Sequence, residues 1–137
     1  MDKESNLIRG TIVFGLRTFG ADPLPVHADL EYDLEDPYAI VVAYHSGGGT
    51  VRWMFGRDLL ADGLLTPSGE GDVIISPADD TSIVVFALSA PDGCAVLEAS
   101  AQELAEFLDR TYDLVPAGSE SEWFDFDQEI GKLVTES

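Results

Sequence analysis

The sequence predicts an α+β domain with an antiparallel sheet of about seven short strands and one main helix late in the chain. Several segments alternate apolar and polar residues, as strands with one buried face do. Clusters of glycine and proline separate these segments. One substantial stretch of helical spacing follows them. The chain has 137 residues, of which 45% are hydrophobic, and this fits a single domain.

The first two strands are predicted from period-two alternation. Residues 8–17 alternate until Pro23 and Pro25, which are expected to end the extended region. Residues 27–33 then resume the alternation, with His27, Asp29 and Glu31 on the face expected to meet water.

The stretch from residue 36 to residue 63, DPYAIVVAYHSGGGTVRWMFGRDLLADG, is the most informative part of the chain. The apolar run from Tyr38 to Tyr44 has no charge, which predicts a strand buried on both faces. Three glycines after Ser46 then favour a tight hairpin. A strand with Val51, Trp53 and Phe55 on one face is expected next, followed by a short helix near residues 57–62.

The second half of the chain holds three more predicted strands and the main helix. The strands are expected at residues 73–75, 83–88 and 95–97, each after turn-forming residues. The helix is expected after Ser100, because Glu103 stands three residues later in capping-box spacing. Four apolar residues then recur at helical spacing and are expected to cover the sheet: Leu104, Phe107, Leu108 and Tyr112.

Charge excludes several classes of partner. Seven basic residues stand against twenty-six acidic ones, a formal net charge of −19. The basic residues are scattered singly, so we expect no nucleic-acid binding and membrane contact only through a partner. The N-terminus lacks the apolar core of a signal peptide and no run is long enough to span a bilayer, so we expect a cytoplasmic protein.

The sequence offers little for catalysis, and we predict a protein without enzymatic activity, cofactor or metal. It has no Gly-x-Ser-x-Gly, phosphate loop or histidine pair at metal spacing. His27 shares a strand face with Asp29 and Glu31, which would allow a metal or acid/base site, but an exposed histidine stabilised by carboxylates is favoured. His45 is interpreted as a turn residue and Cys94 as a small buried thiol.

The composition changes at Pro116, so we divide the chain into a single domain, residues 1–115, and an acidic linker with an amphipathic C-terminal segment, residues 116–137. Trp123, Phe126 and Ile130 recur near helical spacing. The apolar face of this segment is expected to pack on its own domain or on a neighbouring subunit. The alternative is a free partner-binding motif, for which Trp123, Phe124 and Phe126 are the weak candidates.

Five blocks of the chain together resemble the SsgA-like proteins, which control sporulation-specific cell division in spore-forming actinobacteria. They are LPVHADLEYD, the 28-residue stretch quoted above, PSGEGDV, SAPDGCAVLEAS and FLDRTYDLVPAG. The resemblance covers nearly the whole chain. In its length and short acidic C-terminal extension the chain is most similar to the SsgB branch of that family.

The resemblance implies an adaptor that marks future septum sites, recruits the tubulin-like division protein FtsZ and is localised with the help of an SsgA-type relative. It also implies a strongly curved sheet similar to the trimeric whirly-type single-stranded nucleic-acid-binding fold. We therefore expect a homo-oligomer, with a trimer favoured. An oligomeric nucleic-acid-binding module is the alternative, and the acidic composition argues against it.

Overall fold

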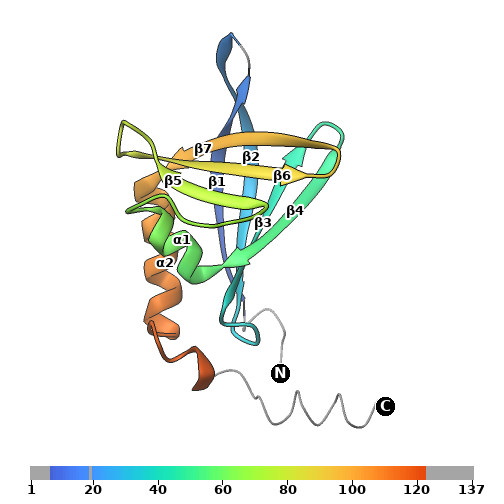
Figure 1. The fold of residues 1–137 in the computed structure, drawn as a ribbon. Helices are drawn as coiled ribbons and strands as arrows, with labels where there is room; N and C mark the ends of the chain where they lie inside the picture. Colours follow the sequence, from blue (N-terminus) through green and yellow to red (C-terminus); the bar gives the residue numbers. More distant parts are fainter. Residues whose placement is uncertain (1–6, 19, 123–137) are drawn as a thin grey trace.

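The computed structural model describes residues 7–18 and 20–122, which form one antiparallel sheet with two helices (Figure 1). The seven strands follow the order β4-β3-β2-β1-β7-β6-β5. The elements are β1 Leu7–Thr18, β2 Ala21–Asp33, β3 Ala39–Ser46, β4 Gly49–Gly56, α1 Arg57–Gly63, β5 Val73–Pro77, β6 Ile83–Ala90, β7 Gly93–Ser100, α2 Ala101–Leu114 and a 3-10 turn, Glu120–Glu122. This confirms the predicted α+β class.

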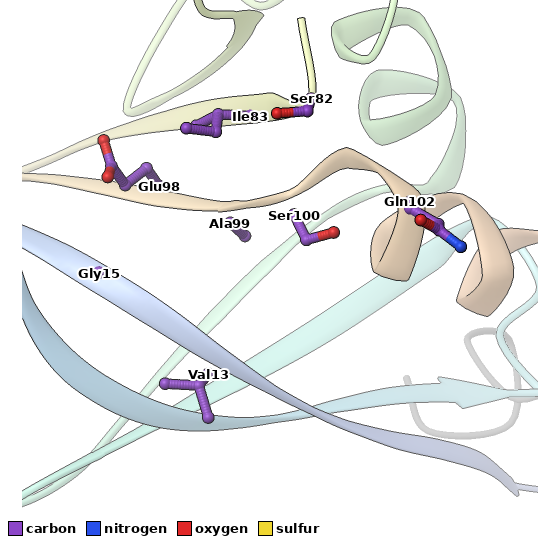
Figure 2. Close-up of a pocket in the computed structure, with 8 residues that line it drawn as sticks. All are labelled: Val13, Gly15, Ser82, Ile83, Glu98, Ala99, Ser100 and Gln102. Atoms are coloured by element: carbon purple, nitrogen blue, oxygen red, sulfur yellow. The ribbon is translucent and has the colours of Figure 1, made fainter. Parts of the chain in front are cut away.

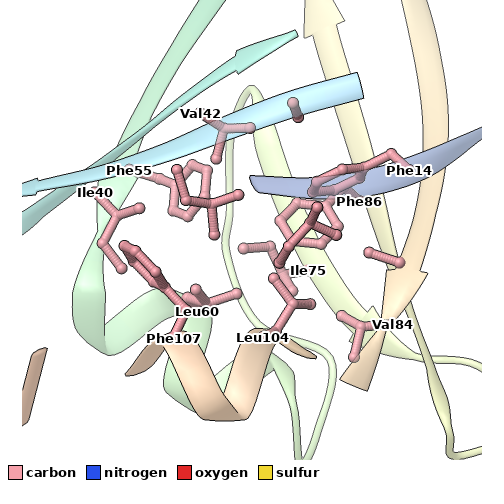
Figure 3. Packing of buried hydrophobic residues seen from close by; sticks show 14 of the residues in the cluster. Phe14, Ile40, Val42, Phe55, Leu60, Ile75, Val84, Phe86, Leu104 and Phe107 are labelled. Carbon is pink, nitrogen blue, oxygen red and sulfur yellow. The ribbon is translucent and has the colours of Figure 1, made fainter. Parts of the chain in front are cut away.

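The sheet curls so strongly that strands far apart in its order meet inside it. Phe55 of β4 and Phe86 of β6 lie near opposite ends of the sheet, yet their ring centroids are 6.0 Å apart. Phe14 of β1, the middle strand of the order, lies edge-on to Phe86 at 5.2 Å and to Tyr44 at 5.0 Å. Figure 3 shows these phenylalanines packed with Leu60 of α1 and with Leu104 and Phe107 of α2. The inner face of the curl is therefore the hydrophobic core.

Local sequence signals account for the hairpin and for the start of α2. Ser46 pairs with Gly49, whose φ of 132° suits a residue without a side chain. The Ser100 hydroxyl accepts from the Glu103 amide at 3.2 Å, as the capping-box spacing predicts. The buried residues of α2 are Leu104, Phe107, Leu108 and Thr111, so the predicted apolar stripe is largely confirmed.

β2 begins earlier than its sequence predicts. Pro23 and Pro25, expected to end the extended region, lie inside β2, and Pro25 pairs with Gly15 of β1. β3 pairs with β2 only from His27 onward, so both prolines stand where β2 has a single neighbour. Proline is tolerated there because one side of the strand has no ladder bonds to lose.

The two outer edges of the sheet differ. β5 is followed on its free side by an isolated bridge, in which Ser68 and Ile75 exchange backbone hydrogen bonds of 2.9 and 3.0 Å. The end of α1 also presses on this strand, since a Cβ on Gly63 would stand 2.4 Å from Ile75 Cγ2. β4 has no such cover among the described residues, so it is the open outer edge.

Candidate functional site

A buried arginine joins four parts of the fold. Arg57 is the first residue of α1, directly after β4, and none of its surface is exposed. Its guanidinium group lies 5.1 Å from the ring centroid of Tyr32 on β2 and 4.4 Å from that of Tyr112 on α2. Both distances suit cation–π contact, which is stronger when the cation is removed from water.

The same guanidinium group binds the chain that follows α2. Arg57 Nη1 donates to the Val115 carbonyl at 2.7 Å and to Thr111 Oγ1 at 3.4 Å, and Nη2 donates to Glu120 Oε2 at 3.0 Å. Arg57 Nε has no partner among the described residues. We call the set Arg57, Tyr32, Thr111, Val115 and Glu120 the Arg57 clasp.

The environment of the clasp shifts the pKa values of its titratable groups. Burial raises the pKa of Tyr32 to about 12, and its hydroxyl donates to the Pro37 carbonyl at 2.8 Å. The pKa of Glu120 is lowered, first by its own backbone amide and then by the hydrogen bond from Arg57. Glu120 is therefore held as a carboxylate, and the clasp is an ion pair at neutral pH.

The clasp also holds part of the predicted acidic linker against the domain. Glu120 is buried, and the Ser119 hydroxyl donates to the Pro116 carbonyl at 2.7 Å. This part of the linker contacts the domain because the Glu120 carboxylate pairs with the buried Arg57. The division of the chain at residue 116 stays a prediction, and the candidates Trp123, Phe124 and Phe126 lie outside the described residues.

A second polar cluster lies on the outer face of the sheet. His45 Nε2 is 2.8 Å from Asp29 Oδ2, and its Nδ1 is 3.0 Å from Thr50 Oγ1. The Thr11 hydroxyl donates to the other Asp29 oxygen at 3.1 Å. The hydrogen bond with His45 is the main cause that lowers the pKa of Asp29. Four strands are joined by these contacts.

The order carboxylate, imidazole, hydroxyl is also that of hydrolytic triads, but the setting here is different. The side chains of His45 and Asp29 are 42% and 44% exposed, whereas a catalytic triad works where preorganised donors replace water. The geometry fits a cross-strand support, in which a histidine and a carboxylate connect neighbouring strands.

Several predictions about single residues need correction. Asp29 is bound by His45, from the next strand, and His27 is the cross-strand partner of His45. His45 lies within β3 instead of in a turn. Cys94 is exposed, because it stands at the outer end of the β6–β7 hairpin opposite Ser89. In the described part of the chain, no group of three His, Cys, Asp or Glu side chains is placed to hold a metal ion.

A hollow of about 420 Å³ lies where β1 and β7 diverge (Figure 2). Val13 and Gly15 form one side, and Glu98, Ala99 and Ser100 form the other. Its side chains combine aliphatic groups with hydroxyl, amide and carboxylate groups, and no nucleophile beside a base is among them. This composition suits contact with a polypeptide better than chemistry on a small molecule.

The fold is shared with a known family. The family model for the Streptomyces sporulation and cell division protein SsgA matches residues 26–120 of the sequence. This range ends at Glu120, the glutamate of the clasp. Within the described residues, no helix is both long and apolar enough to cross a bilayer.

Curated relatives and solved structures agree with the family match. The chain is 52% identical over 129 residues to the sporulation-specific cell division protein SsgB of Saccharopolyspora erythraea, covering 93% of this chain and 92% of that one. It is 49% identical to SsgB of Streptomyces coelicolor over 83% of this chain and 85% of that one.

Two solved structures superpose closely. An SsgA-like sporulation-specific cell division protein from Thermobifida fusca has a TM-score of 0.82 at 43% identity, covering 92% of this chain and 94% of that one. The second structure comes from work on SsgB mutations that correlate to longitudinal cell division during sporulation of Streptomyces coelicolor. It has a TM-score of 0.81 at 42% identity, covering 86% of this chain and 95% of that one. The chain therefore belongs to the SsgA family of sporulation and cell division proteins.

Proposed function

We propose that this chain is a non-enzymatic adaptor of sporulation-specific cell division, which localises to future septum sites and recruits FtsZ to promote Z-ring and septum assembly. The observation that carries the proposal is the similarity, over more than nine-tenths of both chains, to a protein named sporulation-specific cell division protein SsgB. The two polar clusters described above support it, since the Arg57 clasp and the contacts of Asp29 and His45 connect elements of the fold. An SsgA-type relative assists localisation at the septum, and the membrane is reached through a partner.

The distribution of basic side chains supports a protein partner over a nucleic acid. Three of the arginines are already paired with carboxylates: Arg17 with Glu98 at 3.0 Å, Arg52 with Glu31 at 3.5 Å and Arg57 with Glu120 at 3.0 Å. Arg110 lies over the Phe107 ring. Binding of nucleic acid depends on cations that are free to displace counterions from phosphates, so this surface is unsuited to it.

Co-sedimentation with purified FtsZ tests recruitment. The full chain is centrifuged with FtsZ polymers assembled with GTP, and with FtsZ held unassembled in GDP as the control. We expect the chain to pellet only with the polymers, in a saturable manner. A chain that stays in the supernatant at micromolar concentrations of both proteins would contradict direct recruitment.

Adaptor activity on a filament is strengthened by several identical docking faces, so we further propose a homo-oligomer, with a trimer favoured. The support is the exposed apolar surface of the described residues, which includes Val51, Met54 and Leu65 at 54%, 63% and 83% exposure. Light scattering tests this assembly. A particle of three times the 14.8 kDa chain mass is expected, and a concentration-independent monomer would overturn it.

A further inference from the structure

One strand edge in the interior of the sheet is left without a strand partner over most of its length. β1 pairs with β2 from Leu7 to Thr18, but among the described residues its other edge meets β7 only at Gly15 and Leu16. Beyond that junction the chain of β7 turns into α2, so a helix flanks the remaining part of β1 (Figure 1). A strand edge with open backbone groups is a template for another chain.

A groove follows this open edge. Its first part is the hollow of about 420 Å³ between β1 and β7 (Figure 2). Its second part, of about 190 Å³, lies between residues 10–12 of β1 and α2. We call the two together the β1 groove, which is lined by Gly10, Thr11, Ile12, Val13, Gly15, Ser82, Ile83, Glu98, Ala99, Ser100, Gln102, Glu103, Glu106, Phe107 and Arg110.

The helix wall of the groove is held close to the strand by a glycine. A Cβ on Gly10 would stand 2.9 Å from Cδ1 of Phe107, so the missing side chain lets this ring pack against β1. Ile8 and Ile12, on the same strand face as Gly10, are buried in the core. The ring therefore closes the inner side of the groove, and the edge of β1 faces outward between a strand and a helix.

We propose that the β1 groove binds an extended segment of a partner protein, which adds to β1 as a strand and carries basic side chains toward α2. In this mode of recognition, main-chain hydrogen bonds supply affinity and side-chain pockets supply specificity. Val13, 49% exposed on the outer face, offers an apolar contact for the added strand. The proposal goes beyond filament recruitment, since it names a surface and the chemistry of its occupant.

Charge selects the partner. Glu103 and Glu106 stand on the exposed side of α2 along the groove, and Glu106 accepts a hydrogen bond from Gln102 at 3.2 Å. The one cation on this wall, Arg110, lies 5.9 Å from the centroid of the Phe107 ring. The wall therefore has an excess of negative charge that suits a lysine or arginine side chain.

The same charges argue against the two occupants that the chain itself could supply. Residues 123–137 contain four acidic residues and one lysine, so the chain's own C-terminal segment would be repelled by the wall. A second copy has seven basic residues scattered singly along its sequence, so it offers no basic segment to this wall. The open edge of β4 is a weaker site for a partner strand, because the hollow beside β4, which Val51 and Trp53 help to line, has no helix as a second wall.

Peptide selection against the full chain tests the proposal. A phage library of random 12-residue peptides is panned on the protein, and enriched peptides are measured by fluorescence anisotropy. We expect them to alternate apolar residues with Lys or Arg, and to bind at least tenfold more weakly to Val13→Arg. The matched control is Met54→Arg, which places the same charge on an exposed outer-face residue of β4 and is expected to change binding less than twofold.

Hydrogen exchange locates the bound peptide. Amides in residues 9–14 should gain protection on binding, and Glu103→Lys with Glu106→Lys should weaken binding tenfold even if Val13→Arg does not fold. Four results would each overturn the proposal: no enriched peptide, equal affinity for Val13→Arg and Met54→Arg when both are folded, protection at residues 50–55 instead, or full protection of residues 9–14 in the protein alone. The last result would show that the chain fills its own groove.

Discussion

Arg57 and Glu120 are 63 residues apart in the chain, yet their side chains form an ion pair of 3.0 Å in which the arginine has no exposed surface. A buried guanidinium group is tolerated only when carboxylate, carbonyl and aromatic groups compensate for the lost water. Here one side chain connects β2, α1, the end of α2 and the residues that follow it. The stability of this end of the molecule therefore depends on one cation.

Replacement of this arginine is the first prediction. Arg57→Met removes the cation and leaves Glu120 without its partner, so we expect a loss of about 3–5 kcal/mol in the free energy of unfolding. Arg52→Met is the matched control, because Arg52 is 63% exposed and pairs with Glu31 at 3.5 Å. That exposed pair is expected to contribute less than about 1 kcal/mol. Urea denaturation of the two variants measures the contrast, and equal midpoints would contradict the role of the clasp.

The second prediction concerns pH. The pKa of Glu120 is lowered from 4.5 in the folded chain, so its contribution to stability is present above that value and is lost as the pH falls through the folded pKa. The other carboxylates lose their mutual repulsion in the same range, so the comparison must be made with Glu120→Gln. We expect wild-type stability to exceed that of the variant at pH 7, and the gap to narrow below pH 4.5 as the pH falls through the folded pKa. A constant gap in urea midpoints would show that the charge of Glu120 is not responsible.

The third prediction concerns the cluster on the outer face. The hydrogen bond from His45 is the main cause that lowers the pKa of Asp29, and the charge of Arg9 is the smallest. His45→Gln should therefore move the carboxyl titration of Asp29 upward, toward 3.8, by more than Arg9→Gln does. Carbon-13 NMR of the side-chain carboxyl group measures both shifts. The reverse order would mean that long-range charge controls this site.

The fourth prediction separates this chain from nucleic-acid-binding proteins. Fluorescently labelled single-stranded DNA and RNA should show no binding at physiological salt, because the net charge of −19 opposes contact and the seven basic residues are scattered singly along the sequence. Anisotropy titrations at 50 and 150 mM salt measure this. Sub-micromolar affinity that falls steeply with salt would favour the nucleic-acid-binding alternative.

The fifth prediction uses two truncations that differ by four residues. A chain that ends after Gly118 lacks Glu120, so it should melt lower because Arg57 loses its carboxylate. A chain that ends after Glu122 keeps the clasp and removes only the C-terminal segment. We predict that this segment packs on the domain or on a neighbouring subunit, so the chain that ends after Glu122 should also melt lower or dissociate. Unchanged melting and mass together with lost FtsZ binding would make the segment the recruitment element.

Trp123→Ala gives an independent measurement of the same choice. If the indole packs in an interface, its removal should cost about 3–5 kcal/mol or weaken the oligomer correspondingly. Ser121→Ala, at an exposed position two residues earlier, is the control. Equal melting curves for the two variants would indicate a free motif.

The elements of this fold could be predicted because their signals are local. Alternation in residues 8–17, the glycines after Ser46 and the spacing of Ser100 and Glu103 each depend on neighbours within a few residues. The structure confirms these with small shifts of boundary. The extension of β2 through its prolines was missed, since proline is tolerated only where a strand has one neighbour, and the strand order decides that.

The sites could not be predicted in the same way. Arg57 looks like any arginine at the start of a short helix, and nothing nearby marks Glu120 as its partner. The β1 groove exists because β7 leaves β1 after two residue pairs, which is a property of register. The apolar neighbours of Cys94 favour a buried thiol, but its position at the outer end of the β6–β7 hairpin leaves it exposed.

The bridge between Ser68 and Ile75 limits how copies of this molecule can grow into larger assemblies. A sheet that propagates from one molecule to the next needs two complementary rims, and here the β5 rim is closed while the β4 rim is open. Among the described residues β4 is the open outer rim, and pairing of β4 with β4 of a second copy occupies that rim in both, so such pairing stops at two molecules. A ring of three cannot be built from β4-to-β4 pairing and needs other contacts, and the closed β5 rim opposes growth of a continuous sheet through the two outer rims.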